Sequence, residues 1–185
     1  MALQVIPQDI PEVKLVIPQV FGDARGFFQE TFKAEAYREA GIETDFMQDN
    51  WSRSVKGTLR GLHYQLPNPQ DKLVWVVRGE IYDVAVDIRR GSPTFGRWVA
   101  AVLSEANHHQ FFIPAGFAHG FCVMSDEVDF MYKCSAVYSP KDEKGILWSD
   151  PALAIPWPVQ EPILSKRDVA LPPLQHMPDQ DLPAY

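Results

Sequence analysis

Two histidines stand in apolar segments where an imidazole could do chemistry. His63 lies in the segment LRGLHYQ (59–65), and His119 lies in the segment IPAGFAHGF (113–121). Because the ordinary pKa of an imidazole is about 6.5, such a side chain can accept a proton near neutral pH. A single buried histidine is more simply explained as a hydrogen-bonded core residue, so a catalytic role requires suitable neighbours.

Four other side chains supply the groups that proton transfer needs. Arg60 and Lys72 carry positive charge on either side of His63 in the sequence. Tyr132 interrupts an apolar strand, and Asp168 ends a Ser-Lys-Arg-Asp run. Each alone has an ordinary structural explanation as a surface charge, a core phenol or a carboxylate at a helix end. Together they provide a base, an acid, an anion stabiliser and a carboxylate that orients the base.

A metal centre is the competing interpretation of the same histidines. The segment PAGFAH (114–119) resembles the second motif of the cupin superfamily, whose jelly-roll barrels often hold a metal ion in the barrel mouth. The first cupin motif requires His-x-His followed by a glutamate, whereas this chain has HYQ (63–65). Two imidazoles and an amide are a poor set, because divalent metals usually need three or more strong ligands. We therefore expect no metal and no cofactor.

Short strands separated by turn signals make up most of the chain. The expected strands are residues 27–32, 58–65, 73–77, 81–88, 97–103, 110–113, 120–124 and 128–137, and residues 33–41 form one short helix. Many short strands with turns at spacings of roughly 8–12 residues are typical of a sandwich or barrel. Together with the cupin-like motif, this pattern predicts an all-β jelly-roll barrel with a short N-terminal helix.

The positions of Arg60 and His63 impose a geometric requirement on their strand. Strict alternation would send the two side chains to opposite faces of the sheet. Gly61 lies between them and allows a β-bulge that re-aims one side chain. If both side chains point into one cavity, we expect a backbone irregularity there.

The composition of the chain changes at residue 151. Residues 151–185 contain eight prolines, which exclude a central strand or a long helix. We expect residues 151–185 to wrap the barrel as an extended segment with one helical turn near residues 164–168. Residues 1–185 are then expected to form a single domain.

Composition excludes several classes of protein. The net charge of −7 and the pI near 5.2 weigh against nucleic-acid binding, which needs a basic field. Cys122 and Cys134 form no CxxC pair and are expected to be free, buried thiols. The chain shows no secretory signal, and no apolar run approaches the ~20 residues of a membrane span. We expect a soluble cytoplasmic protein with no membrane partner.

A specific resemblance joins these motifs. The chain is similar to the dTDP-4-dehydrorhamnose 3,5-epimerase family in an ordered set of segments that covers nearly its whole length: FGDARGFFQE (21–30), QDN (48–50), LRGLHYQ (59–65), KLV (72–74), DVAVDIR (83–89), SPTFG (92–96), IPAGFAHGF (113–121), YK (132–133), GILWSDP (145–151) and LSKRD (164–168). Each segment alone is a weak signal, whereas the ordered set is strong.

The resemblance implies a reaction in dTDP-L-rhamnose biosynthesis. It is epimerisation at C3 and C5 of dTDP-4-dehydro-6-deoxy-D-glucose, and both carbons lie next to the C4 ketone, so loss of either proton leaves an enolate. His63 would be the base, and Asp168 would orient it. Tyr132 would deliver a proton to the opposite face. Lys72 would stabilise the negative charge on O4.

The same resemblance implies how the nucleotide is bound. Arg25 and Arg60 would hold the diphosphate, because guanidinium groups match phosphate oxygens. Part of the pocket, around residues 25–30, comes from the neighbouring subunit in this family, so a homodimer is implied. Position 167 is commonly lysine in the family and is arginine here. The further implied substrate contacts are Phe28, Glu30, Gln48, Asp49, Asn50, His119, Tyr138, Glu143 and Arg167; Asp83 is a candidate to orient His119.

Three alternatives stay open at this point. A single-centre epimerase acting at C3 or C5 shares the same motifs, and the pocket around Tyr132 and Tyr138 would distinguish it. A metal-dependent cupin enzyme requires a further strong ligand beside His63. A non-catalytic barrel that binds sugar nucleotides would leave the His63, Asp168 and Tyr132 set without a purpose.

Overall fold

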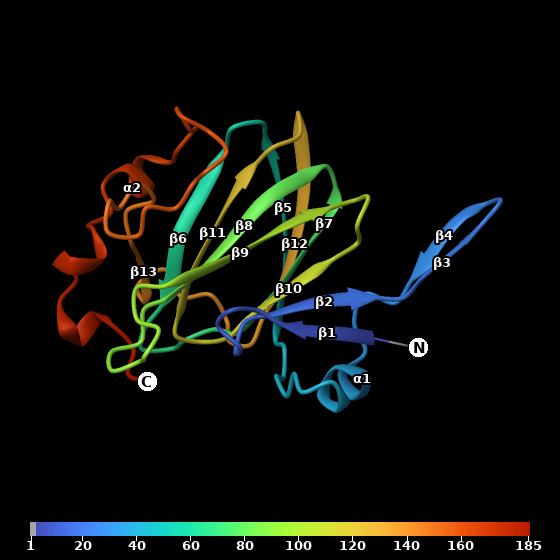
Figure 1. Ribbon diagram of the computed structural model, residues 1–185, viewed down its shortest axis with the longest axis horizontal. Coiled ribbons are helices and arrows are strands. Elements are labelled where there is room, and N and C mark those ends of the chain that lie inside the picture. Colours follow the sequence, from blue (N-terminus) through green and yellow to red (C-terminus); the bar gives the residue numbers. More distant parts are fainter. Residues whose placement is uncertain (1–2) are drawn as a thin grey trace.

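Two antiparallel β-sheets form the body of the protein (Figure 1). The computed structural model describes residues 3–185. The strand order of the larger sheet is β1 (Leu3–Pro7), β2 (Lys14–Pro18), β10 (Gln110–Ile113), β7 (Lys72–Arg78), β12 (Glu127–Cys134) and β5 (Gln48–Val55). The order of the smaller sheet is β13 (Glu143–Gly145), β6 (Leu59–Gln65), β11 (Phe117–Val123), β8 (Glu80–Asp87) and β9 (Trp98–Ser104). The predicted all-β jelly-roll architecture is confirmed.

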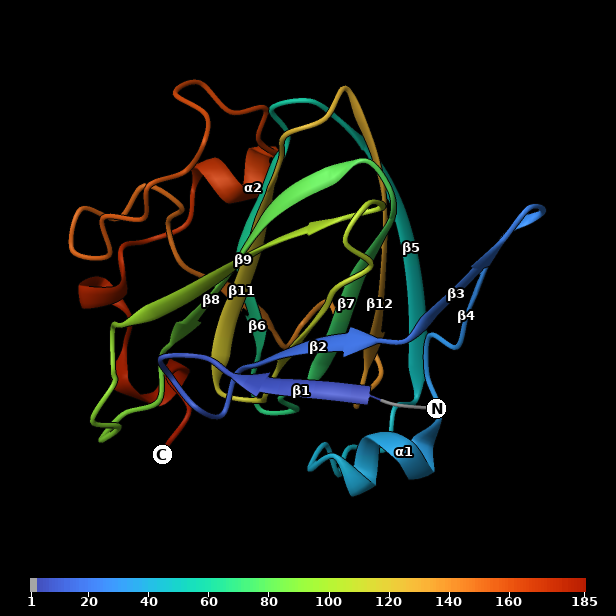
Figure 2. The ribbon, with the colours of Figure 1, turned by 45° about the vertical axis from the view of Figure 1, so that its right-hand side comes forward.

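The remaining elements lie outside the two sheets. The hairpin of β3 (Val20–Asp23) and β4 (Gly26–Gln29) projects away from the body, as Figures 1 and 2 both show. The helices are short: α1 (Ala34–Glu39), α2 (Lys166–Val169), and the 3-10 turns Leu174–His176 and Asp179–Asp181. Within residues 3–185, no helix has the length and apolar character needed to cross a membrane.

Several expected elements need correction at their ends. The strand expected at 120–124 begins at Phe117, and the one expected at 128–137 ends at Cys134. The strand expected at 27–32 ends at Gln29. Strand β5 was not predicted, because its sequence lacks an apolar face. Its inward side chains are polar and line a cavity instead of packing in the core. The edge strands β1 and β13, the inner strand β2 and the hairpin strand β3 were not predicted either.

The apolar core has two main parts. One lies between the sheets and includes Ile81, Ala85, Phe111 and Phe130. The other lies on the outer face of the smaller sheet, where Val84, Val86 and Ile88 of the β8 region pack against Leu153, Leu174 and Leu182 of the C-terminal segment. Strand β8 is therefore buried on both faces, because the C-terminal segment covers its outer side, as predicted for residues 151–185 (Figure 2).

A β-bulge interrupts the pairing of β6 with β11. His63 lies opposite His119 and Arg60 lies opposite Phe121, so two residues of β6 face the single residue Gly120. Gly61 has a φ of +124°, and a Cβ atom at this position would lie 2.6 Å from the Cα of Gly120. The extra residue restores Arg60 and His63 to one side of the sheet, and both line the same cavity. The expected backbone irregularity is confirmed.

Replacing Gly61 should therefore disturb both stability and the site. We expect Gly61→Ala to lower the free energy of unfolding by roughly 3 kcal/mol, because a clash with backbone adds to the strain of a positive φ. The matched control is Gly91→Ala, where φ is also positive (+85°) but nothing lies within 4 Å of the added atom; it should cost about 1 kcal/mol. Denaturant unfolding of both variants measures the difference, and equal losses would contradict the steric role of Gly61.

Candidate active site

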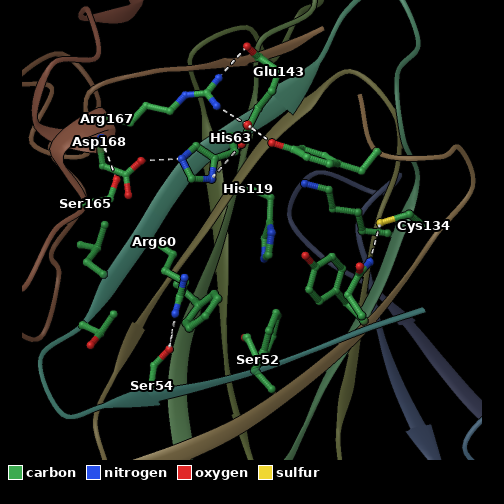
Figure 3. Close-up of a pocket in the computed structure, with 18 of the residues that line it drawn as sticks. Ser52, Ser54, Arg60, His63, His119, Cys134, Glu143, Ser165, Arg167 and Asp168 are labelled. Atoms are coloured by element: carbon green, nitrogen blue, oxygen red, sulfur yellow. Dashed lines mark hydrogen bonds and ion pairs between the residues drawn. The ribbon is translucent and has the colours of Figure 1, made fainter. Parts of the chain in front are cut away.

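An open cavity of about 920 Å³ lies between the two sheets. Its walls come from β5, β6, β7, β11 and β12, and β13 and α2 stand at its rim (Figure 3). Most residues singled out from the sequence line it: His63, Tyr132, Asp168, Lys72, Gln48, Asn50, Arg60, His119, Tyr138, Glu143 and Arg167. Strands from both sheets thus bring together residues that are up to 120 positions apart in the chain.

The imidazole of His63 is fixed by a carboxylate from the C-terminal segment. Nε2 of His63 lies 2.6 Å from Oδ1 of Asp168. Burial by itself would raise the pKa of Asp168, but the hydrogen bond and charge of His63 and the Ser165 hydroxyl hold it below its ordinary value. An ionised carboxylate only accepts hydrogen bonds, so Nε2 of His63 carries the hydrogen. The lone pair of the neutral imidazole is therefore on Nδ1.

Asp168 is itself held by the start of helix α2. The hydroxyl of Ser165, the residue before the helix, accepts a hydrogen bond from the backbone N–H of Asp168 at 3.0 Å. This is the usual arrangement of a serine cap, and it fixes the first turn. The Asp168 side chain is only 4% exposed. Its carboxylate thus reaches His63 from a rigid position.

A second carboxylate lies on the other side of the His63 ring. Oε1 of Glu143 is 3.9 Å from Nδ1 of His63. The other oxygen, Oε2, accepts a hydrogen bond from the hydroxyl of Tyr138 at 2.6 Å and is paired with Nη1 of Arg167. Nη2 of Arg167 also donates to the backbone carbonyl of Glu143 at 2.8 Å. Figure 3 shows the imidazole between Asp168 and Glu143.

A second histidine–carboxylate pair lies deeper in the cavity. Nε2 of His119 is 3.0 Å from both carboxylate oxygens of Asp83, the residue that the sequence suggested as its partner. Asp83 is fully buried; burial raises its pKa, while His119 and Lys72 act against that shift. The His119 ring is stacked on Phe130, with ring centroids 6.3 Å apart. Asp83 thus orients the ring of His119, as Asp168 orients that of His63.

Lys72, Tyr132 and Cys134 form the opposite wall on the larger sheet. Burial raises the pKa of Tyr132, so the phenol keeps its proton through the neutral range. Burial lowers the pKa of Lys72, although Cys134, Glu143 and Asp83 oppose that shift. Cys134 is directly opposite Lys72 in the pairing of β12 with β7. Sequence reasoning missed Cys134 as a cavity residue, although alternation from Tyr132 indicates it.

Polar side chains of β5 and β6 line the rest of the wall. Nε and Nη2 of Arg60 donate to the hydroxyl of Ser54 at 3.1 and 3.0 Å. Gln48 donates to Asn50 at 2.8 Å and accepts from the backbone N–H of Tyr138 at 2.8 Å. Ser54 was not singled out from the sequence, because an isolated serine in an unrecognised strand carries no signal.

Four of the expected substrate contacts do not line the cavity of this single chain. Arg25 is at the tip of the β3–β4 hairpin, is 90% exposed and pairs with Asp23. Phe28 is on the same hairpin and is 63% exposed, and Glu30 directly follows β4. Asp49 points away from the cavity, because alternation along β5 turns it to the outer face, where it accepts from Lys133 at 2.8 Å.

Neither the cysteines nor the other potential metal ligands form a further site among the described residues. Cys122 and Cys134 are free and buried, as expected. Among residues 3–185, no group of three or more histidine, cysteine, aspartate or glutamate side chains is arranged to hold a metal ion.

Comparisons with known proteins identify the family. The family model of dTDP-4-dehydrorhamnose 3,5-epimerase matches residues 7–176. A dTDP-4-dehydrorhamnose 3,5-epimerase of Shigella flexneri is 56% identical over 169 residues, which are 90% of this chain and 93% of the relative. This chain belongs to the dTDP-4-dehydrorhamnose 3,5-epimerase family. The resemblance recognised from its motifs is thereby confirmed.

Solved structures of this epimerase family have the same fold. A dTDP-6-deoxy-D-glucose-3,5-epimerase from Legionella pneumophila Philadelphia 1, in complex with dTDP-4-keto-L-rhamnose, is 52% identical with a TM-score of 0.97, covering 100% of this chain and 99% of that one. A 3'-monoepimerase from Streptomyces bikiniensis, in complex with dTDP-quinovose, is 36% identical with a TM-score of 0.91, covering 97% and 92%.

The carboxylate of Asp168 should be needed for activity as well as for stability. We expect Asp168→Asn to lower kcat by about 10²–10⁴-fold, because a neutral amide neither fixes the tautomer of His63 nor stabilises its protonated form. The control is Asp126→Asn on the surface, where the side chain is fully exposed.

The stability effect has a defined pH dependence. Since folding lowers the pKa of Asp168, its carboxylate stabilises the fold above the ordinary carboxyl pKa of about 4 and loses that effect as the pH falls below it. Asp168→Asn should therefore be less stable than the parent at pH 7, and the gap should narrow below about pH 4. A gap that widens on acidification would contradict this account.

Proposed function

We propose that this protein inverts C3 and C5 of dTDP-4-dehydro-6-deoxy-D-glucose and forms dTDP-4-dehydro-L-rhamnose by removing and returning protons. The observation that carries the proposal is the His63 imidazole, held at Nε2 by Asp168 with Nδ1 available to a substrate in an open cavity. Membership of the epimerase family and 56% identity to a named 3,5-epimerase support the same reaction.

The proposed chemistry follows from the C4 ketone. Protons on C3 and C5 are acidic because either carbanion is an enolate with its negative charge on O4. Nδ1 of His63 removes the proton, and the carboxylate of Asp168 stabilises the imidazolium that forms. The ammonium group of Lys72 stabilises the charge on O4, and its effect is large because the cavity wall is desolvated.

Inversion also needs an acid on the other face of the sugar. His63 belongs to β6 of the smaller sheet, and Tyr132 belongs to β12 of the larger sheet, so the two side chains enter the cavity from opposite walls. Because burial keeps the Tyr132 phenol protonated, it has a proton to give near neutral pH. Removal on one side and return on the other inverts the carbon.

The nucleotide would occupy the polar part of the cavity and its rim. Arg60, already paired with the Ser54 hydroxyl, presents a guanidinium group for the diphosphate. Gln48, Asn50 and Tyr138 are further contacts in this proposal. Since Asp168 comes from the C-terminal segment, we also propose that residues 1–185 work as one domain.

We further propose a homodimer in which a neighbour receives the β3–β4 hairpin. Phe21, Phe27 and Phe28 are 44%, 64% and 63% exposed on this hairpin, which projects from the body of the protein (Figure 2). Exposed aromatic clusters of this kind mark interaction sites. The arrangement would bring Arg25 and Glu30 to the partner's cavity.

The assembly can be measured directly. In sedimentation velocity, we expect the protein to sediment at twice its chain mass of 21.0 kDa. Phe27→Asp should shift it toward the monomer, because a buried unpaired carboxylate destabilises the contact. Lys56→Glu, at an exposed turn position, is the matched surface control. A parent protein that remains monomeric at micromolar concentration would refute the dimer.

The reaction is tested by proton NMR of dTDP-4-dehydro-6-deoxy-D-glucose with the protein in D2O. We expect deuterium to replace the protons at both C3 and C5, and EDTA to leave the rates unchanged. His63→Ala should slow exchange at both carbons by about 10²–10⁴-fold, whereas His176→Ala, an exposed histidine of the C-terminal segment, should not. Full exchange in His63→Ala would exclude His63 as the base.

The same spectra distinguish double epimerisation from the second candidate function, epimerisation at a single carbon. The similarity to a 3'-monoepimerase favours testing that alternative. A single-centre epimerase would exchange and invert one carbon alone. Tyr132→Phe should retain exchange from the His63 side but lose inversion, because the acid of the opposite face is missing. Unchanged inversion in Tyr132→Phe would assign the second acid to another group.

A further inference from the structure

Two successive inversions create a problem of proton supply. In each inversion, the base gains a proton from one face of the sugar and the acid gives one to the other face. After the first inversion His63 is an imidazolium and Tyr132 is a phenolate, so neither can serve the second carbon. Under the function proposed above, both must be restored while the sugar still fills the cavity.

The structure leaves one carboxylate beside the nitrogen that carries this proton. Nε2 of His63 is bound to Asp168, so the removed proton is on Nδ1. Oε1 of Glu143 is 3.9 Å from Nδ1, a separation that a small movement or one bridging water closes. Arg167 and Tyr138 both bind the other oxygen, Oε2. They hold the carboxylate in place and leave Oε1 toward His63.

We propose that Glu143 is a proton relay that acts through His63: between the two inversions it takes the proton from Nδ1 and passes it to solvent. The imidazolium gives one proton to the Glu143 carboxylate, the resulting carboxylic acid gives it to water, and the Tyr132 phenolate takes one proton from water. Charge and protons therefore balance over the step.

The position of Glu143 suits this transfer. Its side chain is 15% exposed at the cavity rim on β13, so it contacts the ring on one side and solvent on the other. His63 is 26% exposed in the open cavity, but a sugar placed against Nδ1 covers that direct route to water.

The other charged groups near the ring cannot accept the proton from Nδ1 of His63. Asp168 is bound to Nε2, and Asp83 is fully buried and paired with His119 across the strand. Lys72 and Arg60 are cations and do not accept a proton from an imidazolium. Among the described residues, the geometry thus assigns the relay to Glu143.

The decisive variant is Glu143→Gln. Its side chain keeps the shape of glutamate and can accept the hydrogen bonds from Tyr138 and Arg167, but an amide cannot take up the proton from the imidazolium. In a single turnover followed by NMR, we expect the rate of the second inversion, divided by the rate of the first, to fall about 10-fold or more below the parent's ratio. Singly inverted sugar should then leave the cavity and accumulate in solution. Glu105→Gln, on the surface, is the matched control and should behave as the parent.

A rescue experiment separates a relay from a simple substrate contact. In Glu143→Ala, added formate should restore the rate of the second inversion, because a small carboxylate can occupy the vacated space and take the proton. Formate should not change the KM. A contact role predicts instead that both inversions slow by one factor, or that the KM alone rises, and that formate has no effect.

The outcomes are distinct. Equal slowing of both inversions in Glu143→Gln, with exchange at both carbons in the parent, would overturn the relay and leave the 3,5-epimerase function intact. Exchange at one carbon alone in the parent would overturn the proposed function, and the relay with it.

Discussion

The hydrogen bond between Nε2 of His63 and Asp168 is the interaction on which the rest of the site depends. It joins a strand of the barrel to the C-terminal segment 105 positions later in the chain. The bond sets the tautomer of the imidazole and hence which nitrogen can act as base. It also gives the C-terminal segment a chemical purpose beyond covering the smaller sheet with Leu153, Leu174 and Leu182.

The backbone at Gly61 meets a second requirement of the proposed mechanism, in which the base and the group that binds the diphosphate share one cavity. Arg60 and His63 are three positions apart, and only the extra residue at the bulge brings them to the same side. The facing sheet supplies Lys72 and Tyr132, so the proposed acid and the proposed base occupy opposite walls. Two sheets packed face to face thus provide the two-sided access that inversion of a carbon requires.

The carboxylates that surround the two histidines of the cavity are each paired. Asp168 holds His63, Asp83 holds His119, and Arg167 holds Glu143. Among the described residues, no buried side-chain nitrogen or oxygen lacks a hydrogen-bond partner. Such pairing makes the site rigid before substrate arrives, which lowers the reorganisation needed during proton transfer.

The sequence was sufficient to predict the fold class, the bulge and the main residues of the cavity, because motifs and turn residues mark these features locally. Gly61 between Arg60 and His63 required an irregularity if both side chains were to enter one cavity, and the ordered motifs singled out His63, Tyr132 and Asp168. Strand β5 left no such signal, since its inward residues are polar. The distance from Glu143 to His63 depends on the pairing of β13 with β6 and on the contact of Arg167 with Glu143, and no local pattern encodes either.

The outward position of Asp49 shows the limit of transferring contacts from a motif. Gln48 and Asn50 enter the cavity, but the residue between them must point the other way in a regular strand. For the residues of the β3–β4 hairpin, the prediction of substrate contacts is limited in a different manner. Their place in a site depends on a second chain, which neither hydropathy nor alternation within one chain can locate.

The central claim is that Asp168 holds the hydrogen of His63 on Nε2 and leaves Nδ1 basic toward the sugar. Nitrogen-15 NMR of protein labelled at its histidine rings tests this directly, with the His63 signals assigned by their loss in His63→Gln. The account predicts a protonated Nε2 and an unprotonated Nδ1 in the neutral ring. A hydrogen on Nδ1 with a bare Nε2 would contradict it.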